Sequence, residues 1–103
     1  MALELRPNCE YCDIDLPVDS PNARICTYEC TFCEHCVDAV LANVCPNCGG
    51  GFERRPIRPR NEWRPGLSAV HQPASTKRRR LAYTAADIAA FSGQLRSTPP
   101  DQR

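Results

Sequence analysis

Eight cysteines are the residues of this chain that could do chemistry, and all lie between positions 9 and 48. Three of their four pairs are spaced C-x-x-C and one is spaced C-x-x-x-C. The pairs are Cys9/Cys12, Cys26/Cys30, Cys33/Cys36 and Cys45/Cys48. Thiolates at such spacings can chelate one ion from a tight turn, and structural zinc prefers four tetrahedral ligands. The pattern predicts two Zn²⁺ ions per chain and permits more than one way of combining the pairs.

A disulfide framework is the alternative use of so many cysteines, and it needs an oxidising compartment. The chain opens with MALELRP, which has no cationic start, apolar core or cleavage site of a secretory signal. No run approaches the roughly 18 apolar residues of a membrane span. We therefore expect a cytoplasmic protein without a membrane partner, in which reduced, clustered cysteines bind metal.

Residues 1–53 are expected to form one zinc-binding domain, because a core of about 50 residues buries too little apolar surface to fold unaided. The β-branched and aromatic run 24–28 predicts a strand, and residues 31–32 suit its hairpin partner. Apolar residues recur at helical spacing over 36–43. The expected fold class is a small zinc-stabilised α+β domain with a β-hairpin and one short helix.

Residues 54–103 differ in composition and are expected to form a largely disordered, basic tail. They carry eleven Lys/Arg against three carboxylates, whereas residues 1–53 carry two arginines against nine carboxylates. Four prolines and few large apolar groups over residues 53–80 favour an extended, solvated chain. Thr84-Ala-Ala-Asp87 resembles a capping box, and an apolar stripe follows it, so a short helix is possible over 84–95.

The cations of this tail are candidates for nucleic-acid binding, because Lys and Arg neutralise phosphates and Trp63 is available for stacking. The candidate residues are Arg54, Arg55, Arg58, Arg60, Arg64, Lys77, Arg78, Arg79 and Arg80. The acidic charge of residues 1–53 opposes this function. It also makes contact between the tail and the chain's own acidic half the default expectation.

The order of the ligand pairs resembles the RING finger over residues 9–48. Cys30-Thr-Phe-Cys33 stands where many RING fingers carry His-x-Phe-Cys, and Cys45-Pro-Asn-Cys48 matches their closing C-P-x-C. The resemblance implies treble-clef knuckles and an interleaved cross-brace. One zinc would be held by Cys9, Cys12, Cys33 and Cys36, and the other by Cys26, Cys30, Cys45 and Cys48. His35 is expected to stay outside both sets, because eight cysteines already satisfy two ions.

RING fingers of ubiquitin ligases hold a charged conjugating enzyme, and the resemblance implies a docking surface here at Tyr11, Val40 and Pro46. A cation that commonly follows the last ligand is replaced by Gly49. Ubiquitin-ligase-like activity is therefore an alternative rather than the leading hypothesis.

A second resemblance covers roughly residues 1–60. The runs MALELRPNCEYCDIDLP, CTFCEHC and CPNCGGGFERRPIRP are similar to a family of small bacterial cysteine-rich proteins catalogued as domain of unknown function 1272. This resemblance implies bacterial origin and no established activity.

No catalytic set stands out in the sequence, and four thiolates per zinc leave no open position for a catalytic water. We therefore expect a protein that is not an enzyme. The leading hypothesis is a zinc-built module that binds a protein partner, with nucleic-acid binding through the tail as the alternative.

Overall fold

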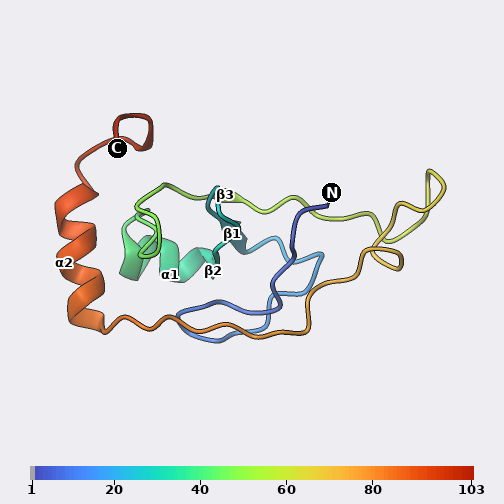
Figure 1. The fold of residues 1–103 in the computed structure, drawn as a ribbon, viewed down its shortest axis with the longest axis horizontal. Coiled ribbons are helices and arrows are strands. Elements are labelled where there is room, and N and C mark those ends of the chain that lie inside the picture. The colour runs from blue at the N-terminus through green and yellow to red at the C-terminus, as the bar shows by residue number, and fades with distance from the viewer. Residues whose placement is uncertain (1) are drawn as a thin grey trace.

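A short β-hairpin forms the centre of the computed structural model, which describes residues 2–103 (Figure 1). Strand β1 spans Ala23–Ile25 and pairs antiparallel with β2, Thr31–Cys33. Arg24 lies opposite Phe32 in this pair. The predicted hairpin is confirmed, with its first strand slightly earlier and shorter than expected.

The helix begins directly after β2. Helix α1 spans Glu34–Cys36 and continues as the π-helical turn η1, Val37–Leu41. It ends where Ala42 takes the left-handed conformation, with φ of 51°. The predicted short helix over 36–43 is present but begins two residues earlier. Strand β3, Glu53–Arg54, then joins the free side of β1 and gives the antiparallel order β2-β1-β3.

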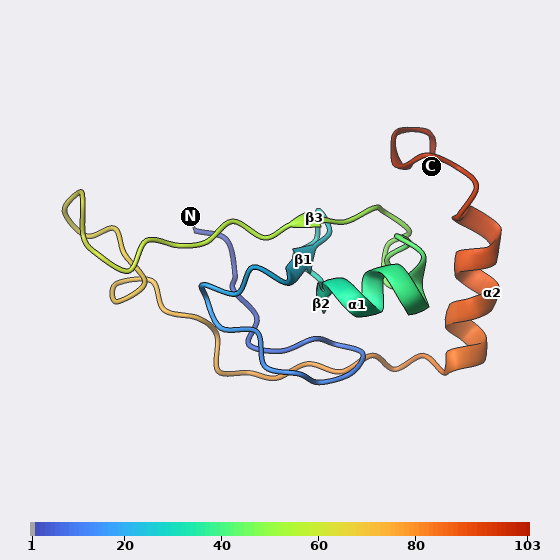
Figure 2. The same cartoon turned by 180° about the vertical axis from the view of Figure 1, so that it is seen from behind.

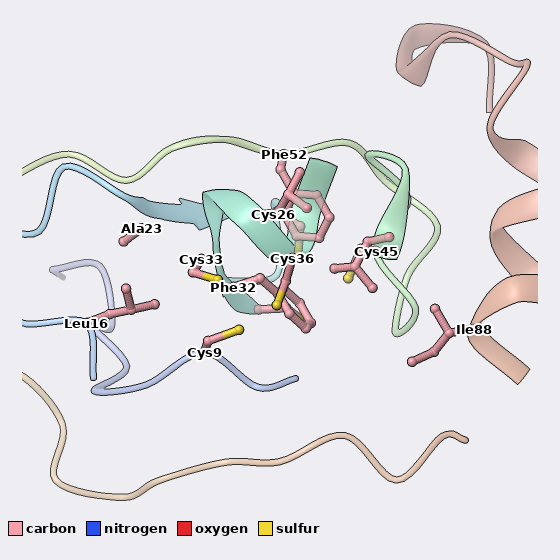
Figure 3. Packing of buried hydrophobic residues seen from close by; sticks show 13 residues of the cluster. Cys9, Leu16, Ala23, Cys26, Phe32, Cys33, Cys36, Cys45, Phe52 and Ile88 are labelled. Atoms are coloured by element: carbon pink, nitrogen blue, oxygen red, sulfur yellow. The ribbon is translucent and has the colours of Figure 1, made fainter. Parts of the chain in front are cut away.

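Cysteines make up much of the core. Phe32 packs edge-to-face on Phe52, with ring centroids 5.3 Å apart, and Leu41 is fully buried beside them. The sulfurs of the buried cysteines lie around these rings (Figure 3). Few aliphatic side chains are left to hold the fold, so the thiols occupy the place that a larger apolar core fills elsewhere.

The second half of the chain is ordered, and the expectation of a largely disordered tail is corrected. After β3 the chain makes a long excursion, returns beside the N-terminal segment and ends in a helix (Figures 1 and 2). Helix α2 spans Ala85–Leu95 and packs against η1, and a short 3₁₀ turn, η2, follows at Pro100–Gln102. The expected capping box is present, since Thr84 and Asp87 exchange side-chain-to-backbone hydrogen bonds.

The returning segment, residues 75–81, is called the strap here because it crosses the N-terminal knuckle. The Asn8 amide donates to the carbonyl of Arg79 at 2.8 Å and accepts from its N–H at 3.2 Å. Arg78 pairs with Asp13 at 2.9 Å and Asp15 at 2.6 Å. The strap is ordered because its backbone and its charge both find partners on the acidic half of the chain, a distant pairing that composition does not reveal.

Arg55, counted with the tail in the predicted division, is part of the core. Its side chain is 1% exposed and donates hydrogen bonds to the carbonyl oxygens of Arg6, Leu16 and Pro17 at 2.8–3.0 Å. A guanidinium enclosed in this way has no surface to offer to phosphates. Arg55 is therefore withdrawn as a nucleic-acid-binding candidate.

Candidate metal centre

The first cluster of thiols joins the N-terminal knuckle to the hairpin and helix. The sulfurs of Cys9, Cys12, Cys33 and Cys36 all lie within 4.8 Å of one another. Cys9 and Cys12 stand on a tight turn, which closes where the Asp13 N–H donates to the Cys9 carbonyl at 2.9 Å. Cys33 ends β2 and Cys36 lies in α1, so the element junction presents both sulfurs to the knuckle.

The spacing inside this cluster fits a tetrathiolate metal site. All eight cysteines are free thiols, and the sulfurs of Cys12 and Cys33 are 3.8 Å apart. A disulfide would place them about 2.05 Å apart. Sulfurs about 2.3 Å from a tetrahedral zinc are separated by about 3.8 Å. The donor chemistry and the geometry therefore both suit a thiophilic ion.

The second cluster brings Cys26, after β1, to the C-terminal knuckle. The sulfurs of Cys26, Cys45 and Cys48 all lie within 4.8 Å of one another. The knuckle turns tightly because the Gly49 N–H donates to the Cys45 carbonyl at 2.7 Å, with φ of 81° at Gly49. That angle belongs to the left-handed region, which glycine adopts without steric cost.

Cys30, the expected fourth ligand, lies at the edge of this cluster rather than inside its closest grouping. Its sulfur accepts a hydrogen bond from the Asn47 side chain at 3.5 Å and also contacts the Cys26 and Cys45 thiols. Two interleaved groups are therefore present, one of four sulfurs and one of three with Cys30 beside it.

The thiols of each cluster cannot all ionise without a cation. Hydrogen bonds with Cys30 and Cys45 lower the pKa of Cys26 to about 3, whereas hydrogen bonds with Cys26 and Cys30 raise the pKa of Cys45. In the first cluster burial raises the pKa of both Cys9 and Cys36. One thiolate is stabilised by neighbours that keep their protons, and a metal ion bound here would supply the charge that allows all of them to ionise.

Buried polar residues outside the cysteine pattern support the N-terminal knuckle, and sequence reasoning missed them. The Glu10 side chain is nearly fully buried and accepts from the Thr31 N–H at 2.7 Å and from Arg6 at 2.9 Å. The Glu10 N–H in turn donates to the Thr31 carbonyl at 3.0 Å. This network ties the knuckle to β2 and so fixes Cys9 relative to Cys33. The i,i+4 spacing of the oppositely charged Arg6 and Glu10 is the sequence feature that indicates this ion pair.

The other residues singled out from the sequence lie outside the two clusters. His35 is exposed on α1 and belongs to neither group of sulfurs. Tyr11 and Val40 are half-buried against the core, and Pro46 is buried beside α2. Among the described residues, no helix has the length and apolar character needed to cross a membrane.

Comparison with known proteins places this cysteine framework in a family. The family profile described as "Protein of unknown function (DUF1272)" matches residues 2–58, which include all eight cysteines and Arg55. The chain belongs to the DUF1272 family. The chain is also 63% identical over 57 residues to "Uncharacterized protein R02474" of Rhizobium meliloti (strain 1021). That alignment covers 55% of this chain and 68% of the relative. No solved structure matches the chain.

The DUF1272 match covers the hairpin, both knuckles and the buried Arg55. It extends past β3 and Arg55 to Arg58 and stops before the long excursion of the chain. We therefore use "the head" for residues 2–58 and "the tail" for residues 59–103. The earlier division at residue 54 would remove Arg55 from the carbonyl oxygens that it bonds.

Proposed function

We propose that this DUF1272 protein is a non-catalytic, zinc-binding module that binds a protein partner. Thiolate sulfur is a soft ligand, and tetrahedral all-thiolate sites favour zinc over harder divalent ions. Four protein ligands per ion close the coordination sphere, so the metal would stabilise the fold rather than activate water. The interleaved sulfur groups support a RING-like cross-brace, with Cys30 completing the second site.

One observation carries the interaction function, namely a groove between the C-terminal knuckle and α2. It has a volume of about 650 Å³ and is lined mainly by apolar side chains. Ile88 anchors α2 at the base, where it is 3% exposed and extends toward the knuckle of Cys45 (Figure 3). The groove is open above Ile88, where its walls are formed by Pro46, Tyr83, Ala90 and Phe91. An open apolar groove on a metal-braced frame is a typical docking site.

Filling the groove tests this function. We expect Ala90→Trp to abolish capture of the partner by immobilised protein in an extract of a native host, because the indole occupies the apolar groove. Ala86→Trp is the matched control, since Ala86 is exposed on the same helix and does not line the groove. Equal capture by both variants, each with wild-type metal content, would reject the groove as the binding surface.

The metal content is a second test. Protein purified without chelator is expected to contain two zinc ions per chain by elemental analysis, one for each sulfur group. Cys48→Ser should lower the value toward one, whereas His35→Ala should retain two because His35 lies in neither group. One ion or none in the unaltered protein, with its thiols intact, would contradict the two-site arrangement.

Nucleic-acid binding is a second candidate, favoured by a groove of about 790 Å³ beneath the strap. Its wall includes Lys77, which would contact phosphates, and the exposed Tyr28, which would stack on a base. Two facts weigh against it. The three arginines of the strap are already paired with carboxylates, Arg78 with Asp13 and Asp15, Arg79 with Glu4, and Arg80 with Asp13. Cys30 and Cys48 in the same wall would bring thiolate charge. We therefore rank it below protein binding.

A further inference from the structure

The end of the molecule opposite α2 is a projecting loop, residues 59–72, which we call the tip (Figures 1 and 2). Three large apolar side chains of the tip face solvent. The exposed fractions are 73% for Trp63, 59% for Leu67 and 78% for Val70. Three large apolar side chains exposed on one loop make the tip a candidate interaction site, because a partner that covered them would remove their surface from water.

The tip is held in one shape by its own polar groups. The Gly66 N–H donates to the Glu62 carboxylate at 3.0 Å, and the Gln72 side-chain amide donates to the Gly66 carbonyl at 2.8 Å. The Ala69 N–H donates to the Pro59 carbonyl at 2.8 Å and closes the base of the loop. An ordered loop presents its apolar side chains at a lower entropy cost than a mobile one.

The charges of the tip are also arranged for contact. Glu62 is occupied by His71, with 2.6 Å between its carboxylate and Nε2 of the ring. Arg60 and Arg64 form no ion pair with any carboxylate in the part of the chain that the structure describes. The tip therefore combines three apolar side chains with two guanidinium groups that are available to a partner.

The groove beside α2 matches the tip in polarity and charge. Within the described residues its lining is apolar or neutral except for Asp87, and it contains no cation. Its volume of about 650 Å³ lies within the range of about 300–1,000 Å³ that is typical of ligand pockets, so one indole can enter. An apolar, cationic projection and an apolar groove with an acidic residue suit each other.

We propose that the tip of one copy docks in the α2 groove of a second copy, with Trp63 as the anchor. The inference rests on the proposed function of the groove and assigns a second molecule of this chain as its partner. The two surfaces lie at opposite ends of a molecule whose longest dimension is 46 Å, so one copy cannot satisfy its own groove. This contact joins two different surfaces, so a pair of molecules still has one free tip and one free groove. Further copies can therefore add at both ends.

Sedimentation of the zinc-loaded full chain measures this association. A contact made by one loop is smaller than a standard interface, so we expect weak binding. The weight-average mass should rise at least about 1.5-fold above the 11.5 kDa monomer between about 10 µM and about 1 mM. Trp63→Ser and Ala90→Trp should each stay monomeric over this range, whereas the controls Ile57→Ala and Ala86→Trp should associate like the unaltered protein.

The decisive experiment mixes the two variants that cannot associate alone, one altered at the tip and one at the groove. Trp63→Ser keeps an intact groove and Ala90→Trp keeps an intact tip, so an equimolar mixture should form one-to-one complexes and stop there. If Ala90→Trp loses metal or helix content, Gln94→Arg at the groove replaces it and opposes the guanidiniums of the tip. A monomeric unaltered protein at about 1 mM, or a mixture that does not associate, overturns the proposal. Loss of host-partner capture in Ala90→Trp would still support the groove's proposed function in that case.

Discussion

Treatment with a strong chelator is expected to unfold the head of the protein and to collapse the amide chemical-shift dispersion of residues 9–48. Structural zinc contributes an apparent 10–16 kcal/mol, roughly, in small thiolate domains. Six of the thirteen side chains in the buried cluster are cysteines, and the others supply only a small apolar core around Phe32. Removal of the ion breaks the metal–sulfur bonds and leaves buried thiols. The apolar surface buried by the rest of the cluster is too small to make up for the stability that is lost.

Nuclear magnetic resonance spectra recorded before and after chelation test this prediction. Readdition of zinc should restore the dispersed spectrum, because ligand thiols remain free in the reduced protein. His35→Ala provides the control and should respond to chelator and zinc like the unaltered chain. A metal-free head that keeps its dispersion would show that Phe32, Leu41 and Phe52 suffice to fold it.

Arg55→Met is expected to lower the free energy of unfolding by about 3 kcal/mol or more. The variant leaves the carbonyl oxygens of Arg6 and Leu16 without a donor, and the bond to Leu16 is fully buried. The Pro17 carbonyl loses its bond to Arg55 but keeps the one it accepts from the Ser20 N–H. Each buried acceptor left without a donor costs about 1–3 kcal/mol. Part of this loss is offset because removing the guanidinium charge from water carries its own cost, and the same burial lowers the pKa of Arg55.

Urea denaturation at a fixed free-zinc concentration measures the effect, since bound metal adds its own linkage to stability. Arg54→Met is the matched control, because Arg54 ends β3 directly before Arg55 and is exposed, and we expect a change within about 0.5 kcal/mol. Equal denaturation midpoints for the two variants would mean that Arg55 does not brace the N-terminal segment.

Features encoded by short-range patterns could be predicted from the sequence. The β-branched run and its partner gave the hairpin, the apolar spacing after Cys36 gave the helix, and the Thr84 capping box placed α2. Each depends on residues within a few positions of one another. The two sulfur groups were also anticipated, although as an implication of the RING resemblance rather than from spacing, which left the pairing open.

The ordered tail could not be predicted in the same way. Its prolines and arginines are typical of solvated chain, yet the Asn8 side chain bonds the backbone of Arg79, and Arg78 reaches Asp13 from 65 positions away. The burial of Arg55 depends equally on carbonyl groups far along the sequence. Composition records which charges exist but not which of them meet, and here the distant partners decide the outcome.

The interleaving of the sulfur groups determines the order in which parts of the structure can form as the chain leaves the ribosome. Cys36 completes the first group, and Cys48, twelve residues later, completes the second, so neither group can close from the first 30 residues alone. The strap at residues 75–81 emerges only after both groups are whole. The acidic knuckle of a nascent chain therefore stays uncovered until the strap has left the ribosome, and both sulfur groups are complete in the chain before the strap can cover it.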